Sequence, residues 1–435
     1  MSPAPLPRAA RSDFRSIGRA LAHRNYRLFF AGQSISLIGT WLTRVATSWL
    51  VYRLTGSAWM LGIVGFAGQF PTFVLAPVAG VWVDRWNRHR VLVVTQALAL
   101  VQSGLLAYLA LRNIITVPHV IALSIFQGVI NAVDMPARQS FVIDMIGSRR
   151  EDLPNAIALN SSMFNGARLV GPSVAGMLIA WVGEGWCFFI DAVSYLAVIA
   201  SLLLMSVAIA PRPNRETSVV REIRDGYRYV IGFTPIRSVL LLLALVSLLG
   251  FPYTVLMPVM AGSVLHGGPH TLGFLMAASG LGALTGALYL ASRNTVLGLG
   301  RVIARSAAGF GLGLVLFSLS RNVWLSMALM VVCGLTMILQ MAASNTVIQT
   351  LVDDDKRGRV MSFYAMAFFG TAPFGSLFAG TVATWIGVPR TILLGGAACA
   401  VTAFGFWKAL PHLRRAAHPI YVRLGILPSP TEQNL

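Results

Sequence analysis

Apolar stretches of about twenty residues follow one another along most of this 435-residue chain, and small groups of arginines separate them. A helix of roughly 20 apolar residues is long enough to cross the ~30 Å hydrocarbon core of a bilayer. The sequence therefore predicts an all-α membrane protein of twelve transmembrane helices, surrounded by the lipid bilayer. The predicted spans are 28–53, 58–83, 91–111, 117–136, 156–182, 186–208, 237–262, 271–291, 302–319, 323–350, 360–386 and 390–408.

Composition and charge agree with a membrane protein and argue against a nucleic-acid partner. Hydrophobic residues make up 56% of the chain and charged residues only 11%, whereas soluble domains carry about 25% charged residues. The formal net charge of +19 would also suit a nucleic-acid-binding protein. The arginines, however, are divided among the short segments between apolar stretches, so they form no single basic region. We expect no nucleic-acid partner.

The basic residues alternate along the connecting segments. If the N-terminus is cytoplasmic, 28 of the 34 Lys and Arg residues lie on the cytoplasmic side, four lie outside, and Arg44 and Arg168 lie within spans. This asymmetry is typical of the positive-inside rule. We therefore expect a multi-pass protein of the cell (inner) membrane with both termini in the cytoplasm. The first apolar run is too long for a signal peptide, so the N-terminal tail is expected to be retained.

A polar segment divides the chain into two halves that resemble each other. The predicted parts are an N-terminal tail (1–27), a six-helix bundle (28–208), a central loop (209–236), a second six-helix bundle (237–408) and a C-terminal tail (409–435). Four glycines and a tryptophan recur at an offset of 204 residues, which indicates two pseudo-symmetric halves. The shared glycines allow corresponding helices to pack closely. The matched pairs are Gly166/Gly370, Gly171/Gly375, Gly176/Gly380, Trp181/Trp385 and Gly183/Gly387.

The segment Gly80-Val-Trp-Val-Asp84-Arg85-Trp-Asn-Arg88 ends the second predicted span. It closely resembles the loop motif that members of the major facilitator superfamily carry between their second and third spans, although Trp82 and Asn87 replace the usual Leu and Gly. The resemblance implies that Asp84 faces the N-terminus of the eleventh span, where a helix dipole favours a carboxylate. A cytoplasmic latch between the halves is therefore expected, and a basic loop that only anchors the chain is the alternative. The expected latch residues are Gly80, Asp84, Arg85, Arg88 and Arg359.

Glycines and a proline in the fifth span resemble the motif of exporting major facilitators, although plain helix packing is an alternative explanation. The motif residues are Gly166, Gly171, Pro172 and Gly176. The stretches 55–57, 153–160 and 357–362 resemble the enterobactin-exporter and transmembrane secretion effector branch of the superfamily. Over residues 20 to 410 this resemblance implies a major facilitator fold and an alternating-access exporter.

Polar residues recur at helical spacing in several spans, which places them on one face of each helix. In major facilitators, spans one, four, seven and ten line the substrate cavity, so these faces are expected to be wet. Hydrogen bonding between helices is the alternative for each single residue. The expected pathway residues are Gln33, Ser36, Thr40, Arg44, Gln127, Asn131, Arg168, Gln340 and Ser344.

Four ionisable residues lie within or at the border of the predicted spans, all in the N-terminal half: Arg44, Asp134, Arg168 and Asp191. Such residues are costly in a membrane and mark functional sites. Arg44 and Asp191 are at similar depth and are predicted to pair. Arg168 could hold an anionic substrate or be satisfied by backbone carbonyls. Asp134 is equally suited to brace Arg85 or Arg88 and to carry a proton, so Asp134 and Asp191 are the coupling candidates.

Other functional classes find little support in the sequence. The chain has two lysines and no Gly-x4-Gly-Lys-Ser/Thr segment, which excludes a phosphate-binding loop and ATP-driven transport. The histidines and cysteines are scattered, so we expect no enzyme, no metal site and no cofactor. The sequence predicts a monomeric secondary transporter that exports a small amphipathic organic molecule, drug-like or siderophore-like, coupled to protons. A transport-inactive receptor or scaffold is the alternative.

Overall fold

The computed structural model describes residues 18–146, 150–206, 219–293, 295–353 and 356–427, and these residues form helices and short connections without a strand. The outer parts of both predicted tails and the first part of the predicted central loop lie outside the described residues. The all-α fold class is confirmed.

Each of the first six predicted spans coincides with one helix, because turn residues stand where the apolar stretches end. Ser57 and Asn87 cap the second and third helices, since their side chains accept hydrogen bonds from the backbone N–H groups of Met60 and Arg90. The helices of this half are α1 (Arg24–Thr55), α2 (Ala58–Arg85), α3 (Arg88–Leu111), α4 (Val117–Ile146), α5 (Leu153–Val182) and α6 (Glu184–Leu203), with short 3-10 turns η2 (Arg19–Ala22) and η3 (Arg150–Asp152).

The second half is less regular than the sequence predicts. The seventh span breaks between α8 and α9 at Gly250–Pro252, where proline cannot continue the hydrogen-bond ladder. The predicted central loop contains the helix α7, which packs through Gly226 against Phe363. The helices are α7 (Val219–Gly232), α8 (Thr234–Leu249), α9 (Tyr253–Val259), α10 (Pro269–Ala291), α11 (Leu299–Leu319), α12 (Val323–Leu351), α13 (Arg357–Ala365), α14 (Ala372–Ile386) and α15 (Val388–Arg423), with π-helical turns η4 (Met260–Val264) and η5 (Met366–Gly370).

Ten of the described helical stretches are long and apolar enough to cross a membrane. The stretches α1 and α5 are not among these ten, although they are as long as the others. They are the helices that hold Arg44 and Arg168. The two predicted spans with the weakest apolar character therefore carry the two mid-helix arginines.

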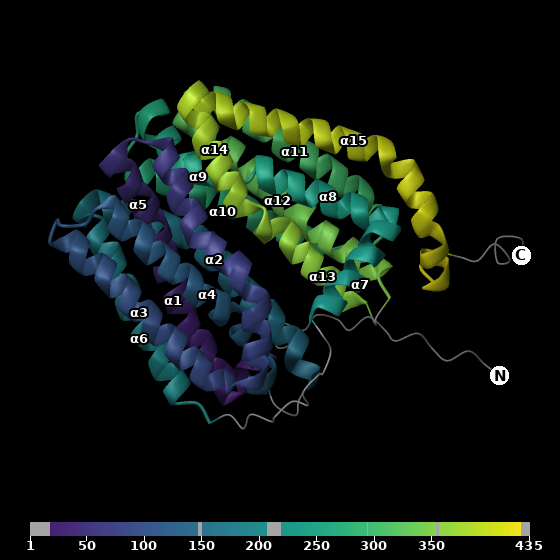
Figure 1. Cartoon of the computed structure of the whole chain (residues 1–435), viewed down its shortest axis with the longest axis horizontal. Helices are drawn as coiled ribbons and strands as arrows, with labels where there is room; N and C mark the ends of the chain where they lie inside the picture. Colours follow the sequence, from purple (N-terminus) through teal and green to yellow (C-terminus); the bar gives the residue numbers. More distant parts are fainter. Residues whose placement is uncertain (1–17, 147–149, 207–218, 294, 354–355, 428–435) are drawn as a thin grey trace, which may run out of the picture.

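The two halves lie side by side, with α1–α6 in purple through blue to teal and α8–α15 in green-teal to yellow (Figure 1). They meet along two seams, one between α5 and α10 and the other between α2 and α14. Gly176 faces Gly273 in the first seam, and Gly62 faces Gly380 in the second. Since Gly176 and Gly380 are 204 residues apart, the offset found in the sequence relates the two seams of the structure.

Candidate functional site

Arg44 lies in the middle of α1, with its guanidinium group 4.7 Å from the centre of the Trp41 ring. Trp41 in turn packs on Gly171 of α5, where a Cβ would lie 2.5 Å from the Cβ of Trp41. The helix α1 contacts α2, α4, α5 and α6 of its own half and α9 and α10 of the other half. Because helices surround α1 on so many sides while the Arg44 side chain stays exposed, we infer that Arg44 reaches the space between the halves.

Arg168 lies at the midpoint of α5, and its backbone oxygen is 2.8 Å from where a Cβ of Gly280 on α10 would stand. Its guanidinium group is close enough to interact electrostatically with Arg44 and with Tyr253 of α9. The Tyr253 hydroxyl shares a hydrogen bond of 3.2 Å with Ser279 of α10. Arg44 and Arg168 thus interact with each other in the first half, and the hydrogen-bonded hydroxyl groups of Tyr253 and Ser279 lie on α9 and α10 of the second half. We call Arg44 and Arg168 the arginine pair.

The predicted ion pair between Arg44 and Asp191 does not form, so that prediction is wrong. Asp191 is buried, and its Oδ2 accepts hydrogen bonds from the hydroxyl groups of Thr43 (2.7 Å) and Ser103 (2.8 Å). Its Oδ1 has no hydrogen-bond partner in the described residues. Adjacent helical positions point about 100° apart. Thr43 therefore faces α6 while Arg44 faces elsewhere, although both residues lie at the depth of Asp191.

Asp134 is engaged within its own half. Its Oδ1 accepts hydrogen bonds from Thr95 and Gln96 of α3, each 2.8 Å long, and its Oδ2 pairs with Arg138 one turn further along α4. The predicted brace to Arg88 is wrong, because Arg88 pairs with a different carboxylate of α4, that of Asp144. The side chain of Arg85 lies outside the described residues.

The predicted polar faces are buried to different degrees. Gln33 and Ser36 of α1 are buried, the Thr40 hydroxyl donates to the Ser36 carbonyl oxygen, and Gln127 donates to Asn131 within α4 at 3.0 Å. On α12, Gln340 and Ser344 are also buried. Both polar side-chain atoms of Gln340 and the hydroxyl of Ser344 make no hydrogen bond in the described part of the chain. Buried polar atoms without partners typically cost about 1–3 kcal/mol each.

The predicted latch is described in part. Gly80 has open space around it, and the side chains of Asp84 and Arg85 lie outside the described residues. Arg359 stands in the first turn of α13, beside Gly226 of α7. Arg88 is buried, and its guanidinium donates to Asp144 at 2.9 Å. The predicted latch residue Arg88 therefore ties α3 to α4 within the first half.

Removing Arg88 is expected to destabilise the protein strongly. The side chain of Arg88 is 3% exposed and that of Asp144 is 15% exposed, so Arg88→Leu would leave a poorly solvated carboxylate. Breaking a buried ion pair on one side typically costs about 3–5 kcal/mol. Thermal unfolding of purified protein should show a lower midpoint, and the double variant Arg88→Leu, Asp144→Leu should recover part of the loss. Equal midpoints of Arg88→Leu and the unchanged protein would contradict this expectation.

The fifth-span motif has a packing role that differs from glycine to glycine. A Cβ at Gly176 would lie 2.6 Å from the Pro269 carbonyl oxygen, and one at Gly273 would lie 2.4 Å from the Pro172 carbonyl oxygen. Gly166 has no atom within 4 Å of the place where its Cβ would stand. Thus Gly171 serves the contact with α1, Gly176 serves the seam with α10, and Gly166 serves neither.

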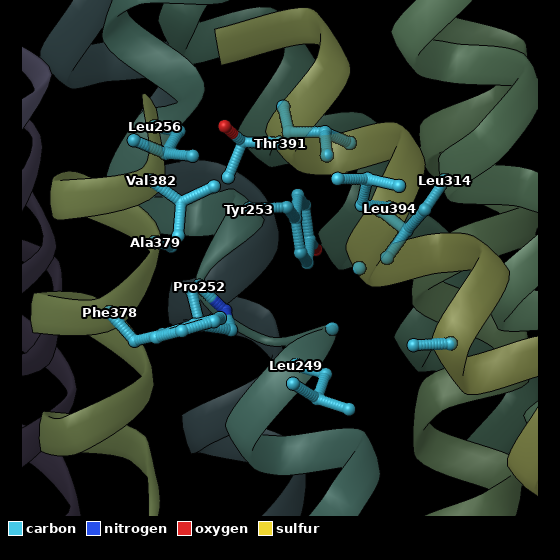
Figure 2. A pocket seen from close by; sticks show the side chains of 14 residues that line it. Leu249, Pro252, Tyr253, Leu256, Leu314, Phe378, Ala379, Val382, Thr391 and Leu394 are labelled. Atoms are coloured by element: carbon cyan, nitrogen blue, oxygen red, sulfur yellow. The ribbon is translucent and has the colours of Figure 1, made fainter. Parts of the chain in front are cut away.

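An apolar pocket of about 230 Å³ lies inside the second half, next to the break between α8 and α9. Figure 2 shows Leu249, Pro252 and Tyr253 beside this break, with side chains of α14 and α15 across from them. None of the predicted pathway residues lines this pocket. Tyr253 is the residue that the pocket shares with the surroundings of the arginine pair.

Several residues of the site were not expected from the sequence. Ser279 bonds the hydroxyl of Tyr253, while Thr43, Ser103 and Thr95 hold the two carboxylates. Hydroxyl groups are common within membrane helices, and their spacing in the sequence does not reveal which neighbouring helix they face. The hydroxyl residues that hold Asp134 and Asp191 could have been predicted from one signal, which is a serine or threonine at the same depth in the membrane as a buried carboxylate.

The sequence is similar to a family of membrane transport proteins. The model of the transmembrane secretion effector family matches residues 18–419. The chain is 26% identical to the staphyloferrin A transporter of Staphylococcus aureus, covering 85% of this chain and 92% of the relative. It is 26% identical to the multidrug efflux pump Tap of Mycolicibacterium fortuitum, covering 82% and 88%. It is 24% identical to the macrolide efflux protein A of Streptococcus pyogenes, covering 86% and 94%.

Solved structures share the fold at low sequence identity. A bacterial homologue of the human lysosomal transporter Spinster, in an inward-facing and unoccupied conformation, superposes with a TM-score of 0.65 at 13% identity and covers 96% of this chain and all of its own. A POT family transporter superposes with a TM-score of 0.69 at 13% identity, covering 90% and 99%. The chain therefore belongs to the transmembrane secretion effector family of the major facilitator superfamily and is a multi-pass membrane transporter.

Proposed function

We propose that this protein exports a small amphipathic organic molecule across the cell membrane by alternating access, driven by a proton gradient. The observation that carries the proposal is the pair of glycine seams, related by the internal repeat, that close the two halves against each other beside the arginine pair. Contacts in which backbone meets backbone, as at Gly62 with Gly380, can separate without breaking side-chain networks. Rocking of one half against the other is the motion by which transporters of this architecture work.

The seams lie towards the end of the molecule that we assign to the outside. Tyr52 and Ser263, which share a hydrogen bond of 2.7 Å across the halves, stand near the ends of α1 and η4 at that side. The arginine-rich segments stand at the other end, and the positive-inside rule places them in the cytoplasm. With this orientation, the conformation is closed outside, and the substrate would enter from the cytoplasm.

Asp191 is our candidate for the proton-coupling residue. Asp134 receives hydrogen bonds on both oxygens, including one from the guanidinium group of Arg138. Asp191 pairs with no cation in the described residues, and its Oδ1 is unpartnered and buried. It could therefore take up a proton with little rearrangement. The cytoplasmic latch of Gly80, Asp84 and Arg85 with Arg359 remains part of the proposal.

The substrate class rests on the relatives. Their names describe transport of a siderophore, of several drugs and of macrolides, which are organic molecules of moderate size. The unpartnered Gln340 and Ser344 would gain hydrogen bonds if α12 came to face the substrate in another conformation. Export is favoured by the relatives that are named efflux proteins.

Flux into everted membrane vesicles tests the proposal. Vesicles that contain the protein, energised by respiration, should accumulate at least one compound from a panel of amphipathic cations, anions and neutral macrolides, and a protonophore should abolish the accumulation. Vesicles without the protein are the control. If no compound moves and the gradient has no effect, a transport-inactive receptor or scaffold becomes the better explanation.

A further inference from the structure

The arginine pair carries two positive charges in the middle of membrane helices without a negative partner among the residues that the structure describes. Neither guanidinium group forms a hydrogen bond or an ion pair with any residue that the structure describes, and that of Arg44 lies over the ring of Trp41. The charges of Arg44 and Arg168 also repel each other. Arginines within a membrane usually pair with an acidic side chain or with backbone carbonyl groups, and they often mark a substrate pathway. An unsatisfied cationic pair at this depth is therefore unusual.

The chain itself has few ways to supply the missing negative charge. Asp191 is held by Thr43 and Ser103, and Asp134 is paired with Arg138. The sequence has no Asp or Glu between residues 237 and 352 or between 356 and 431. Rocking of the second half against the first thus brings no carboxylate of its spans to the arginine pair. The described spans therefore supply no counterion for the arginine pair.

Two hydroxyl groups of the second half, those of Tyr253 and Ser279, lie on helices that face the first half. Tyr253 lies within electrostatic range of Arg168, and its hydroxyl shares a hydrogen bond with Ser279. Ser279 immediately precedes Gly280, the residue at which α10 comes closest to the Arg168 backbone. An anionic group between the halves would accept charge-assisted hydrogen bonds from guanidinium groups on one side and neutral ones from hydroxyls on the other.

We propose that Arg44 and Arg168 bind an anionic group, a carboxylate or a sulfonate, of the exported molecule. This inference rests on the proposed function and names its substrate class as organic anions. The hydroxyl of Tyr253 completes the site from the second half, so that binding bridges both halves of the protein.

Binding can be measured directly by ligand-induced stabilisation of the purified protein in a neutral detergent. The probes are 2-naphthoate and 2-naphthalenesulfonate, with the neutral 2-naphthamide and the cationic 2-naphthylmethylammonium as partners of matched size. A ligand that binds only the folded state raises the unfolding temperature in proportion to its affinity. We expect a concentration-dependent rise with the two anions and none with the amide or the ammonium compound.

Variants assign the binding to the arginine pair. Arg44→Gln and Arg168→Gln should each weaken 2-naphthoate binding at least ~10-fold, the effect of losing about 1.4 kcal/mol. Their ligand-free unfolding temperatures should not fall, because each change removes an unpaired charge. Arg168→Lys keeps the charge and should bind with intermediate affinity. Arg112→Gln is the matched control, because Arg112 is an exposed arginine in the connection between α3 and α4.

The inference is overturned by no stabilisation by either anion, by equal stabilisation by 2-naphthamide, or by unchanged 2-naphthoate binding in both Arg→Gln variants. Equal stabilisation by inorganic sulfate would also overturn it, because the site would then be a general anion site. Flux into proteoliposomes separates this inference from the proposed function. If neutral or cationic compounds move and the anions do not, only the anion inference fails. If no compound moves, the proposed function fails.

Discussion

Replacing Gly176 with alanine is expected to open the outer side of the transporter and to reduce transport at least ~10-fold. A Cβ at this position would lie 2.6 Å from the carbonyl oxygen of Pro269 and 3.0 Å from the Cα of Gly273, so α5 and α10 must separate. Overpacking of a close contact typically costs about 1–3 kcal/mol. The cost falls only on conformations in which the seam is closed, and it therefore shifts the population towards the open one.

Gly166→Ala is the matched control, because it makes the same change on the same helix where no atom lies within 4 Å. A cysteine introduced at Ser376, a buried position in the other seam, reports opening by its reaction with a membrane-impermeant maleimide on intact cells. Background labelling should be low, since the native cysteines Cys187, Cys333 and Cys399 are all buried. Gly176→Ala should raise the labelling rate, and Gly166→Ala should not. Equal rates in the two variants would show that the seam is not a gate.

Asp191→Asn is expected to abolish transport driven by a proton gradient while leaving exchange of substrate down its own gradient intact. The side chain keeps its shape, and its carbonyl oxygen can still accept the hydrogen bonds from Thr43 and Ser103. What it loses is the capacity to bind and release a proton. The measurement compares gradient-driven uptake with counterflow of the same labelled compound in proteoliposomes.

Asp134→Asn is the comparison, because Asp134 is a buried carboxylate of the same half that is already paired with a cation. This variant should keep gradient-driven transport if it folds, since we assign Asp134 a structural role. Folded yield, measured by gel filtration, distinguishes a loss of transport activity from a loss of folding. Retained gradient-driven transport in Asp191→Asn would refute the assignment of Asp191 as the coupling residue.

The positions of the helices and the internal repeat could be predicted from the sequence because both depend on local features. The length of an apolar stretch sets a membrane helix, and the spacing of Gly166, Gly171 and Gly176 repeats in the second half. The break of the seventh span at Pro252 carried a visible signal, but the long apolar run around it favoured a continuous helix. The helix α7 lies in a polar segment, and its contact with α13 forms only in the folded protein.

The partners of the buried charges could not be predicted, for a geometric reason. Depth along a helix can be counted in residues, and by this count Arg44 and Asp191 match. The direction of a side chain around its helix matters equally, and it depends on where the neighbouring helices stand. Thr43 points to Asp191, whereas Arg44 lies over the ring of Trp41. Sequence spacing relates residues within one helix but gives no common angular reference for two helices.

The charged residues of the predicted spans are distributed unequally between two halves that share one architecture. The acidic groups within the predicted spans and the two mid-helix arginines belong to α1, α4, α5 and α6, while the facing helices of the second half contribute hydroxyl and apolar surfaces. A preference for substrate charge can therefore change by substitutions in the first half alone. A preference for substrate size or shape can change by substitutions in the second half that leave Arg44, Arg168 and Tyr253 in place. The two properties can accordingly be selected, or engineered, independently of each other.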